Sequence, residues 1–126
     1  MPSTLDDLGR AQYLLLTTYR KDGRAVATPL WVVRDGDALA VWTPTKSGKI
    51  KRLRRRSGVL VGACDFRGNP LGEQVSGRAS IMDAAGSDRV RSLIRRKYGV
   101  MGWLTVNGSL LRRGRAGTVG IHITLS

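Results

Sequence analysis

The sequence predicts a mainly β protein of the α+β class, a small closed or half-closed antiparallel β-barrel with two or three short helices. Short runs rich in β-branched and aromatic residues are separated by Asp-Gly turn signals. The last run alternates, with Val119, Ile121 and Ile123 on one face and small or polar residues on the other. Two segments have helical spacing. About six short strands are therefore expected to form the barrel.

A three-stranded meander is expected over residues 13–20, 25–34 and 38–43. Asp22-Gly23 supplies the first tight turn between these strands, and Asp35-Gly36 supplies the second. Pro29 cannot donate to a strand ladder. The second strand is therefore expected to be interrupted, bulged or at a sheet edge at this residue.

A basic helix is expected over residues 48–57. Its only apolar positions are Ile50 and Leu53, an i,i+3 pair on one face. So thin an apolar stripe indicates a helix that lies on the surface of the barrel. Because these two residues take the buried side, Lys49 and Arg52 are expected to face solvent.

The second half of the chain adds further strands at 58–65, 72–82 and 116–125. Between the last two, Ser87 is a plausible N-cap of an amphipathic helix that runs to Gly99. Residues 100–111 are ambiguous and compatible with a second short helix. The length suits one domain over residues 1–126.

The cysteine and histidine counts exclude several classes of site. One Cys rules out an intramolecular disulfide, and one Cys with one His cannot build a zinc site from nitrogen and sulfur ligands, so no metal site is expected. No apolar run approaches the ~20 residues of a membrane span. The first ten residues are polar and acidic, unlike a signal peptide. A cytoplasmic protein without a membrane partner is expected.

The inventory of catalytic groups is poor, and the catalytic residues stay unassigned. His122 is the only histidine and Glu73 the only glutamate, so neither a serine triad nor a carboxylate pair is indicated. Walker and dinucleotide-binding glycine motifs are absent from the sequence. An enzyme of this composition must import its chemistry in a cofactor. Tyr98 and His122 are candidate proton donors.

A formal net charge of +13 favours a polyanionic partner: nucleic acid, an anionic membrane or a multiply charged small molecule. A basic nucleic-acid-binding barrel is one alternative. Aromatic residues make up only 6% of the chain, and the three Trp fall at strand or helix positions instead of forming an evident stacking platform. Nucleic acid is therefore the less favoured partner.

The segment from Trp42 to Arg56 is the most informative one. A strand ends at Thr43, a polar loop follows, and a helix begins near Gly48, so hydroxyls, helix N–H groups and cations converge where an anion could bind. The alternative is a solvated basic helix face. The candidate anion-binding residues are Thr43, Lys46, Ser47, Lys49, Lys51, Arg52, Arg54, Arg55 and Arg56.

A second candidate element surrounds Pro29. Because proline removes one ladder donor, backbone groups beside it stay available for a ligand. Next to an aromatic side chain, they could engage the edge of a planar heterocycle. The alternative is an edge-strand proline beside a core tryptophan. The candidate residues are Thr28, Pro29, Leu30 and Trp31.

Four runs in this order, LLLTTYRKDGRAVATPLWVV, TPTKSGKIKRLRRR, GVLVGACDFRGNPLG and VSGRA, resemble the pyridoxamine-phosphate-oxidase-like (PPOX-class) split β-barrel family. More narrowly, they resemble its branch of deazaflavin-dependent oxidoreductases, which use coenzyme F-420. The resemblance covers roughly residues 12–124. It implies a six-stranded split barrel of the FMN-binding type and a homodimer with cofactor sites across the subunit interface. It also implies that the region of Thr43, Ser47, Lys49 and Arg52 holds the cofactor phosphate, and that residues 28–31 contact the ring system.

Within this family the cofactor is FMN or the deazaflavin, and charge favours the deazaflavin. FMN carries one phosphate, whereas the deazaflavin adds an oligoglutamate tail. Cations beyond the phosphate clamp, at Lys51 and Arg54 to Arg56, suit such a tail. The expected function is hydride transfer between coenzyme F-420 and a small organic substrate. An FMN oxidoreductase and a non-catalytic cofactor-binding protein remain alternatives. Residues 99–115 are the least family-like and are expected to shape the substrate pocket, so the substrate is not identified.

Overall fold

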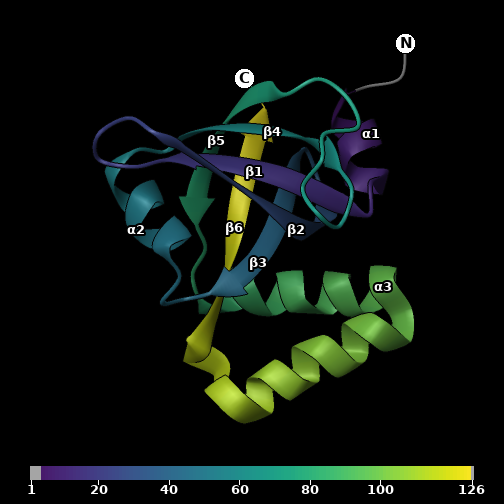
Figure 1. Cartoon of the computed structure of the whole chain (residues 1–126). Helices are drawn as coiled ribbons and strands as arrows, with labels where there is room; N and C mark the ends of the chain where they lie inside the picture. Colours follow the sequence, from purple (N-terminus) through teal and green to yellow (C-terminus); the bar gives the residue numbers. More distant parts are fainter. Residues whose placement is uncertain (1–3, 126) are drawn as a thin grey trace.

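Six strands and three α-helices make up the computed structural model, which describes residues 4–125 (Figure 1). The strands are β1 (Tyr13–Tyr19), β2 (Ala25–Asp35), β3 (Ala38–Pro44), β4 (Gly58–Cys64), β5 (Val75–Ile81) and β6 (Thr118–Leu125). The helices are α1 (Thr4–Arg10), α2 (Gly48–Arg55) and α3 (Ala84–Arg113), and a 3₁₀ turn, η1 (Arg115–Gly117), follows α3. The strands close into one barrel in the order β1-β2-β3-β6-β5-β4, with every neighbouring pair antiparallel. The expected six-stranded antiparallel barrel is confirmed.

Alternating side chains fill the barrel. Leu14, Leu39, Val41, Ile121 and Ile123 are fully buried and belong to one apolar cluster. Two helices add to the same cluster, α2 through its two apolar residues and α1 through Leu8. The thin apolar stripe on α2 therefore anchors this helix to the barrel, as its spacing indicates.

Lys49 and Arg52 lie on the side of α2 away from Ile50 and Leu53, as expected, but both are only partly exposed. The Nε of Arg52 donates a 2.6 Å hydrogen bond to the hydroxyl of Thr18, which is buried at the end of β1. The Arg52 side chain thus folds back onto the barrel.

The barrel is splayed between β2 and β3. The ladder of β2 with β1 runs from Ala25 to Trp31, whereas the ladder with β3 begins only at Val32. Residues 25–31 of β2 therefore form a one-sided edge. Pro29 lies in the middle of this edge, opposite Leu15 of β1. The edge position expected for this proline is confirmed.

Helix α3 is longer than expected and bends at Gly99, whose φ of 60° is open to glycine and strained for other residues. Its first half packs on the outside of the barrel through Val90 and Ile94, and its second half turns back beside the first (Figure 1). Residues 100–111 are thus helical, as the sequence allowed. They do not form a separate short helix, however, but the second half of a kinked 30-residue helix.

Three elements, α3, β5 and α1, show the clearest differences from the sequence expectation. Asp83 caps α3 by accepting a 2.8 Å hydrogen bond from the Gly86 amide, whereas Ser87 is buried and accepts one from the Gly120 amide. The fifth strand begins at Val75 instead of residue 72. Helix α1 was not expected, since seven residues with one buried leucine carry little periodic signal. None of the helices within residues 4–125 has the length and apolar character that a bilayer crossing requires.

Candidate functional site

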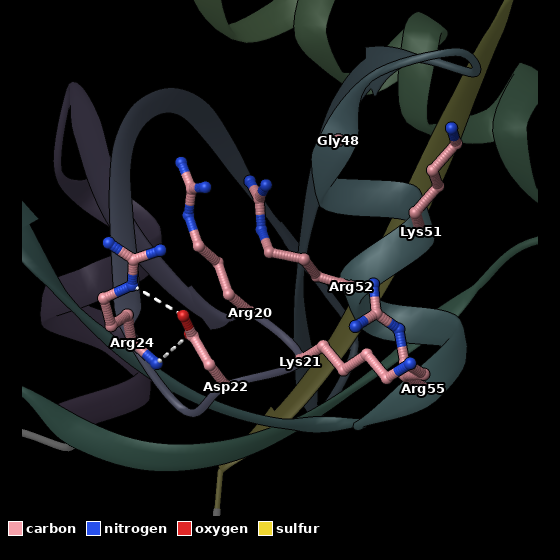
Figure 2. A pocket seen from close by; sticks show the side chains of 8 residues that line it. All are labelled: Arg20, Lys21, Asp22, Arg24, Gly48, Lys51, Arg52 and Arg55. Atoms are coloured by element: carbon pink, nitrogen blue, oxygen red, sulfur yellow. Dashed lines mark hydrogen bonds and ion pairs between the residues drawn. The ribbon is translucent and has the colours of Figure 1, made fainter.

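A hollow of about 790 Å³ lies between the β1–β2 hairpin and α2 (Figure 2). We call it the basic hollow. Figure 2 shows Arg20 and Arg52 extending in the same direction, with their guanidinium groups next to each other. The hollow holds six cationic side chains and one carboxylate. Its lining residues are Arg20, Lys21, Asp22, Arg24, Gly48, Lys51, Arg52 and Arg55.

The single carboxylate of the basic hollow is already engaged. Asp22 accepts hydrogen bonds from the backbone amide and the Nε of Arg24, at 3.1 and 2.8 Å. Burial, together with the positive charges of Arg20 and Arg55, lowers the pKa of Arg52. Like charges held this close repel one another, so a bound anion would stabilise the arrangement.

Gly48 leaves room for the guanidinium of Arg52 at the start of α2. A Cβ atom at residue 48 would lie only 2.8 Å from Nη1 of Arg52. The hydrogen bond from Nε to Thr18 fixes the other side of the same group. The sequence therefore positions Arg52 from two directions at the rim of the hollow.

The β3–α2 loop contributes less than the sequence suggested. Thr43 is buried and its hydroxyl donates to that of Ser47 at 3.4 Å, while Ser47 makes no side-chain cap to the helix. Burial, and then the charge of Arg52, lower the pKa of Lys49. Lys46 is exposed. These four residues lie outside the lining of the basic hollow.

The last residues of the basic segment, from Lys51 to Arg56, lie in different places. Lys51 and Arg55 line the basic hollow with Arg52, whereas the exposed Arg54 does not. The guanidinium of Arg56 lies over the ring of Tyr19, 4.1 Å from its centroid. That contact places Arg56 in a smaller hollow of about 200 Å³ beside the hairpin.

A second cavity, of about 600 Å³, lies between the outer face of the barrel and the second half of α3. We call it the aromatic cavity. Of the four residues predicted around Pro29, three line it, and Thr28 does not. The barrel contributes Tyr13, Pro29, Leu30, Trp31, Trp42 and Pro44, and α3 contributes Leu104, Thr105, Gly108, Ser109, Arg112 and Arg113.

Tyr98 of α3 holds one wall of the aromatic cavity. Its ring stacks on Trp31, with centroids 4.4 Å apart and planes inclined by 8°. Its hydroxyl lies 2.7 Å from the carbonyl oxygen of Gln12, and it bonds the amide and carbonyl of Val32 at 3.0 Å. Burial raises the pKa of Tyr98 to about 12. With its hydroxyl engaged, Tyr98 positions Trp31 and does not line the cavity.

His122 is the other candidate proton donor. It is half-buried on β6, between Ala40 of β3 and Ser80 of β5. It lines neither the basic hollow nor the aromatic cavity. The structure thus places both candidate proton donors outside these two sites.

Trp42 leaves an unused donor in the wall of the aromatic cavity. Its Nε1 is buried and has no hydrogen-bond partner among residues 4–125. A buried N–H without an acceptor costs free energy that a bound oxygen would recover. The cavity therefore suits a planar molecule that carries oxygen acceptors.

The one-sided edge of β2 connects the two sites. Arg24 precedes this edge at the basic hollow, and Trp31 ends it at the aromatic cavity. Seven residues of strand span roughly 23 Å. An elongated ligand with a planar head and an anionic tail could therefore occupy both sites at once.

Sequence reasoning missed the hairpin cations, Arg20, Lys21 and Arg24. Flanking an Asp-Gly turn, they read as ordinary turn residues. Only the closure of the barrel brings them opposite α2, which lies about 30 residues further along the chain. Arg112 and Arg113 fall within residues 99–115, the segment expected to shape the substrate pocket, but they were not named as site residues.

Comparisons with known proteins agree with this architecture. An F-420 reductase superimposes with a TM-score of 0.64 at 20% identity, covering 100% of this chain and 96% of its own. A conserved hypothetical protein from Mycobacterium tuberculosis gives a TM-score of 0.70 at 20% identity, covering 99% of this chain and 81% of its own. A heme storage protein from Vibrio cholerae gives 0.64 at 12% identity, covering 91% and 82%. Likeness at these identities shows the fold alone.

The sequence itself identifies the family. No curated protein matches this chain. The family model of pyridoxamine 5'-phosphate oxidase matches residues 3–123, nearly the whole length. Together with the splayed six-stranded barrel, this match shows that the chain belongs to the pyridoxamine 5'-phosphate oxidase family of split β-barrel proteins.

Proposed function

We propose that this protein is an oxidoreductase that binds the deazaflavin coenzyme F-420 and positions it for hydride exchange with a small organic substrate. One observation carries the proposal. A cavity walled by flat aromatic side chains and a separate hollow with six cations lie at the two ends of the same open strand edge. A planar ring joined to a long anionic tail matches this pairing.

The residues present fit such a coenzyme. Pro29, Leu30 and Trp31 would face the ring system, and the unpaired N–H of Trp42 would meet a ring oxygen. The phosphate and glutamate groups would bind in the basic hollow, where Arg offers paired donors to phosphate and carboxylate oxygens. When bound, the coenzyme supplies or accepts a hydride, while the organic partner exchanges a proton separately.

The protein's own contribution is positioning and exclusion of water. The stack of Tyr98 on Trp31 fixes the wall against which the ring would lie. No carboxylate, histidine or lysine lines the described aromatic cavity. The proton that accompanies the hydride therefore has to reach the substrate through water or a lining hydroxyl.

The number of cations favours the deazaflavin over FMN. A single phosphate is satisfied by two or three donors, whereas the basic hollow presents five Arg and Lys side chains besides Arg24, which is paired with Asp22. An oligoglutamate tail gives these cations partners.

We also propose a homodimer in which the second copy covers the aromatic cavity. Large apolar side chains are exposed on two segments, Phe66 (63% accessible) and Leu71 (70%) between β4 and β5, and Met101 (62%) and Trp103 (57%) on α3. Tyr13 lines both the aromatic cavity and a neighbouring hollow that includes Phe66 and Leu71. Burial of this surface would stabilise a dimer.

The test is a binding titration of the purified full-length protein. Oxidised coenzyme F-420 is followed by its fluorescence, and FMN and a short single-stranded oligonucleotide are titrated in parallel. We expect micromolar or tighter binding of the deazaflavin and weaker binding of FMN. Tighter binding of FMN would contradict the cofactor. Tight, steeply salt-dependent oligonucleotide binding that the deazaflavin does not displace would indicate a nucleic-acid protein.

Turnover separates an enzyme from a carrier. The reduced coenzyme is mixed with the protein and candidate acceptors, and its oxidation is followed by absorbance. Acceptor-dependent oxidation supports an enzyme. Tight binding with no oxidation by any of a broad acceptor panel would instead support a cofactor carrier.

A further inference from the structure

Arg112 and Arg113 end α3 at the border of the aromatic cavity. Both side chains are exposed, and neither has a hydrogen bond or ion pair within residues 4–125. Cations in the last turn of a helix complement its dipole, and this accounts for positive charge at this position. It does not account for the position of two unpaired guanidinium groups beside an aromatic-lined cavity.

The neighbouring sequence supplies no acidic side chain. From Arg89 to Ser126 the sequence contains eight Arg and Lys residues and no Asp or Glu. The nearest acidic group in sequence, Asp88, is bound by Arg91 and Arg115. Within residues 4–125 no carboxylate pairs with Arg112 or Arg113, so both guanidinium groups are available to an anionic ligand.

The other residues that line the cavity indicate the shape and polarity of such a ligand. On the barrel side, the lining includes Trp42 and Pro44, whose rings are flat and largely apolar. On α3 itself, a Cβ atom at Gly108 would meet no heavy atom within 4 Å, so the helix backbone is uncovered there. A thin, flat molecule can lie against this part of the helix.

We propose that the substrate of the aromatic cavity is a planar, largely apolar carboxylate, bound by Arg112 and Arg113 on the α3 side. The proposal rests on the proposed function, since the coenzyme ring occupies the opposite wall at Pro29 to Trp31. A cavity of about 600 Å³ falls within the range that holds drug-sized ligands. The substrate ring then lies between the coenzyme and the helix, with its carboxylate at the cavity mouth.

The experiment uses two probes of the same shape, 2-naphthoate and the neutral 2-naphthylmethanol. Their binding to the full-length protein is measured by isothermal titration calorimetry, without coenzyme and with oxidised coenzyme F-420 bound. We expect naphthoate to bind roughly three- to tenfold more tightly than the alcohol, the range for one or two exposed ion pairs. The double variant Arg112→Gln/Arg113→Gln should lose this preference.

A charge-matched control excludes general attraction of anions to a basic protein. Arg78→Gln/Arg96→Gln removes two exposed arginines that line neither site and leaves the same net charge. This control should keep the preference for naphthoate. In Gly108→Leu the new side chain meets no neighbouring atom at its Cβ, so the variant should fold. Its side chain should fill part of the cavity and weaken the binding of both probes.

Equal affinity for the two probes in the wild type, or equal loss of preference in both double variants, would overturn the proposal. A tenfold loss of deazaflavin affinity in Arg112→Gln/Arg113→Gln would also overturn it, because the two arginines would then bind the coenzyme and not the substrate. Absence of deazaflavin binding together with retained naphthoate preference would refute the proposed cofactor alone.

Discussion

The rings of Trp31 and Tyr98 stack face to face, 4.4 Å apart, and join the splayed edge of the barrel to α3. Strand β1 begins at Tyr13, opposite Trp31, so Val32, the next residue of β2, has no β1 partner. The Tyr98 hydroxyl takes that place by bonding the backbone of Val32. The orientation of Trp31 in the aromatic cavity therefore depends on the docking of α3.

Substitution of Tyr98 separates the hydrogen bonds from the stack. Tyr98→Phe should lower the free energy of unfolding by about 1–2 kcal/mol, because the Val32 amide loses its partner in a half-buried place. Tyr98→Leu should cost about 0.5–1.5 kcal/mol more, since the stack is lost as well. Urea unfolding measures both changes. Equal stability of the two variants would show that the stack contributes nothing.

Lys97 should make stability depend on pH. Its ammonium lies 2.6–2.9 Å from the carbonyl oxygens of Gly9, Ala11 and Val32. Burial lowers the pKa of Lys97 from 10.5 to about 8. Between these values the unfolded chain binds more protons than the folded one, so the free energy of unfolding should rise with pH.

The measurement compares the wild type with Lys97→Met, which keeps the stem of the side chain but cannot titrate. The difference in Tm between the two should move in favour of the wild type from about pH 7.5 to about pH 10. A difference that stays constant over this interval would show that the carbonyl oxygens hold the Lys97 proton as firmly as water does.

Arg20 and Arg52 should carry the largest share of anion binding. Arg20→Ala and Arg52→Ala should each weaken coenzyme F-420 binding roughly ten- to a hundredfold, the loss of one charge-assisted contact worth about 1.5–3 kcal/mol. Lys49→Ala should weaken it less, because Lys49 lies outside the basic hollow. Arg54→Ala is the exposed control. An effect of Arg54→Ala as large as that of Arg20→Ala would remove the basic hollow from the binding site.

The length of the glutamate tail should affect affinity through Lys51 and Arg55. Each added glutamate should contribute about 0–1 kcal/mol until the cations of the hollow are used. Salt should reduce this gain, because the Debye length falls from about 10 Å at 0.1 M to about 3 Å at 1 M. In Lys51→Gln/Arg55→Gln, affinity should no longer rise with tail length, while the tail-less cofactor still binds. A length dependence that persists in this variant would contradict the assignment.

Light scattering tests the homodimer. At micromolar concentration the protein should have twice the 13.7 kDa mass of one chain. Phe66→Ser/Leu71→Ser should shift the equilibrium toward the monomer, since both side chains are exposed in the isolated chain. Glu73→Gln, a nearby polar change, is the control. A wild-type monomer at this concentration would refute the dimer and the covered cavity together.

Strand positions follow from short-range signals. Asp-Gly turns and period-2 alternation depend on neighbouring residues, and they predict β1 to β3 and β6 closely. Pro29 marks the open edge for a local reason too, since its missing donor is a property of the residue itself. The thin apolar stripe of α2 likewise predicts which side of that helix is buried.

Helix ends were predicted less well, because competing partners lie far away in sequence. Ser87 has the composition of an N-cap, but its hydroxyl is used by the Gly120 amide of β6, and Asp83 caps the helix instead. The second half of α3 shows weak amphipathic character because both of its faces carry apolar residues. On one face Val106 is buried in the cluster between α3 and the barrel, whereas Trp103 and Leu104 are exposed.

The sequence by itself determined the strand order along the chain, the family and the presence of a basic helix with one buried face. Only the tertiary structure decided which cations act together. Arg20 meets Arg52 because closure of the barrel brings a hairpin beside α2, and Arg112 meets the wall of Trp31 because α3 folds back at Gly99. Local patterns report the face on which a side chain lies. The distance between two such faces depends on how the whole chain closes, and no short stretch of sequence encodes it.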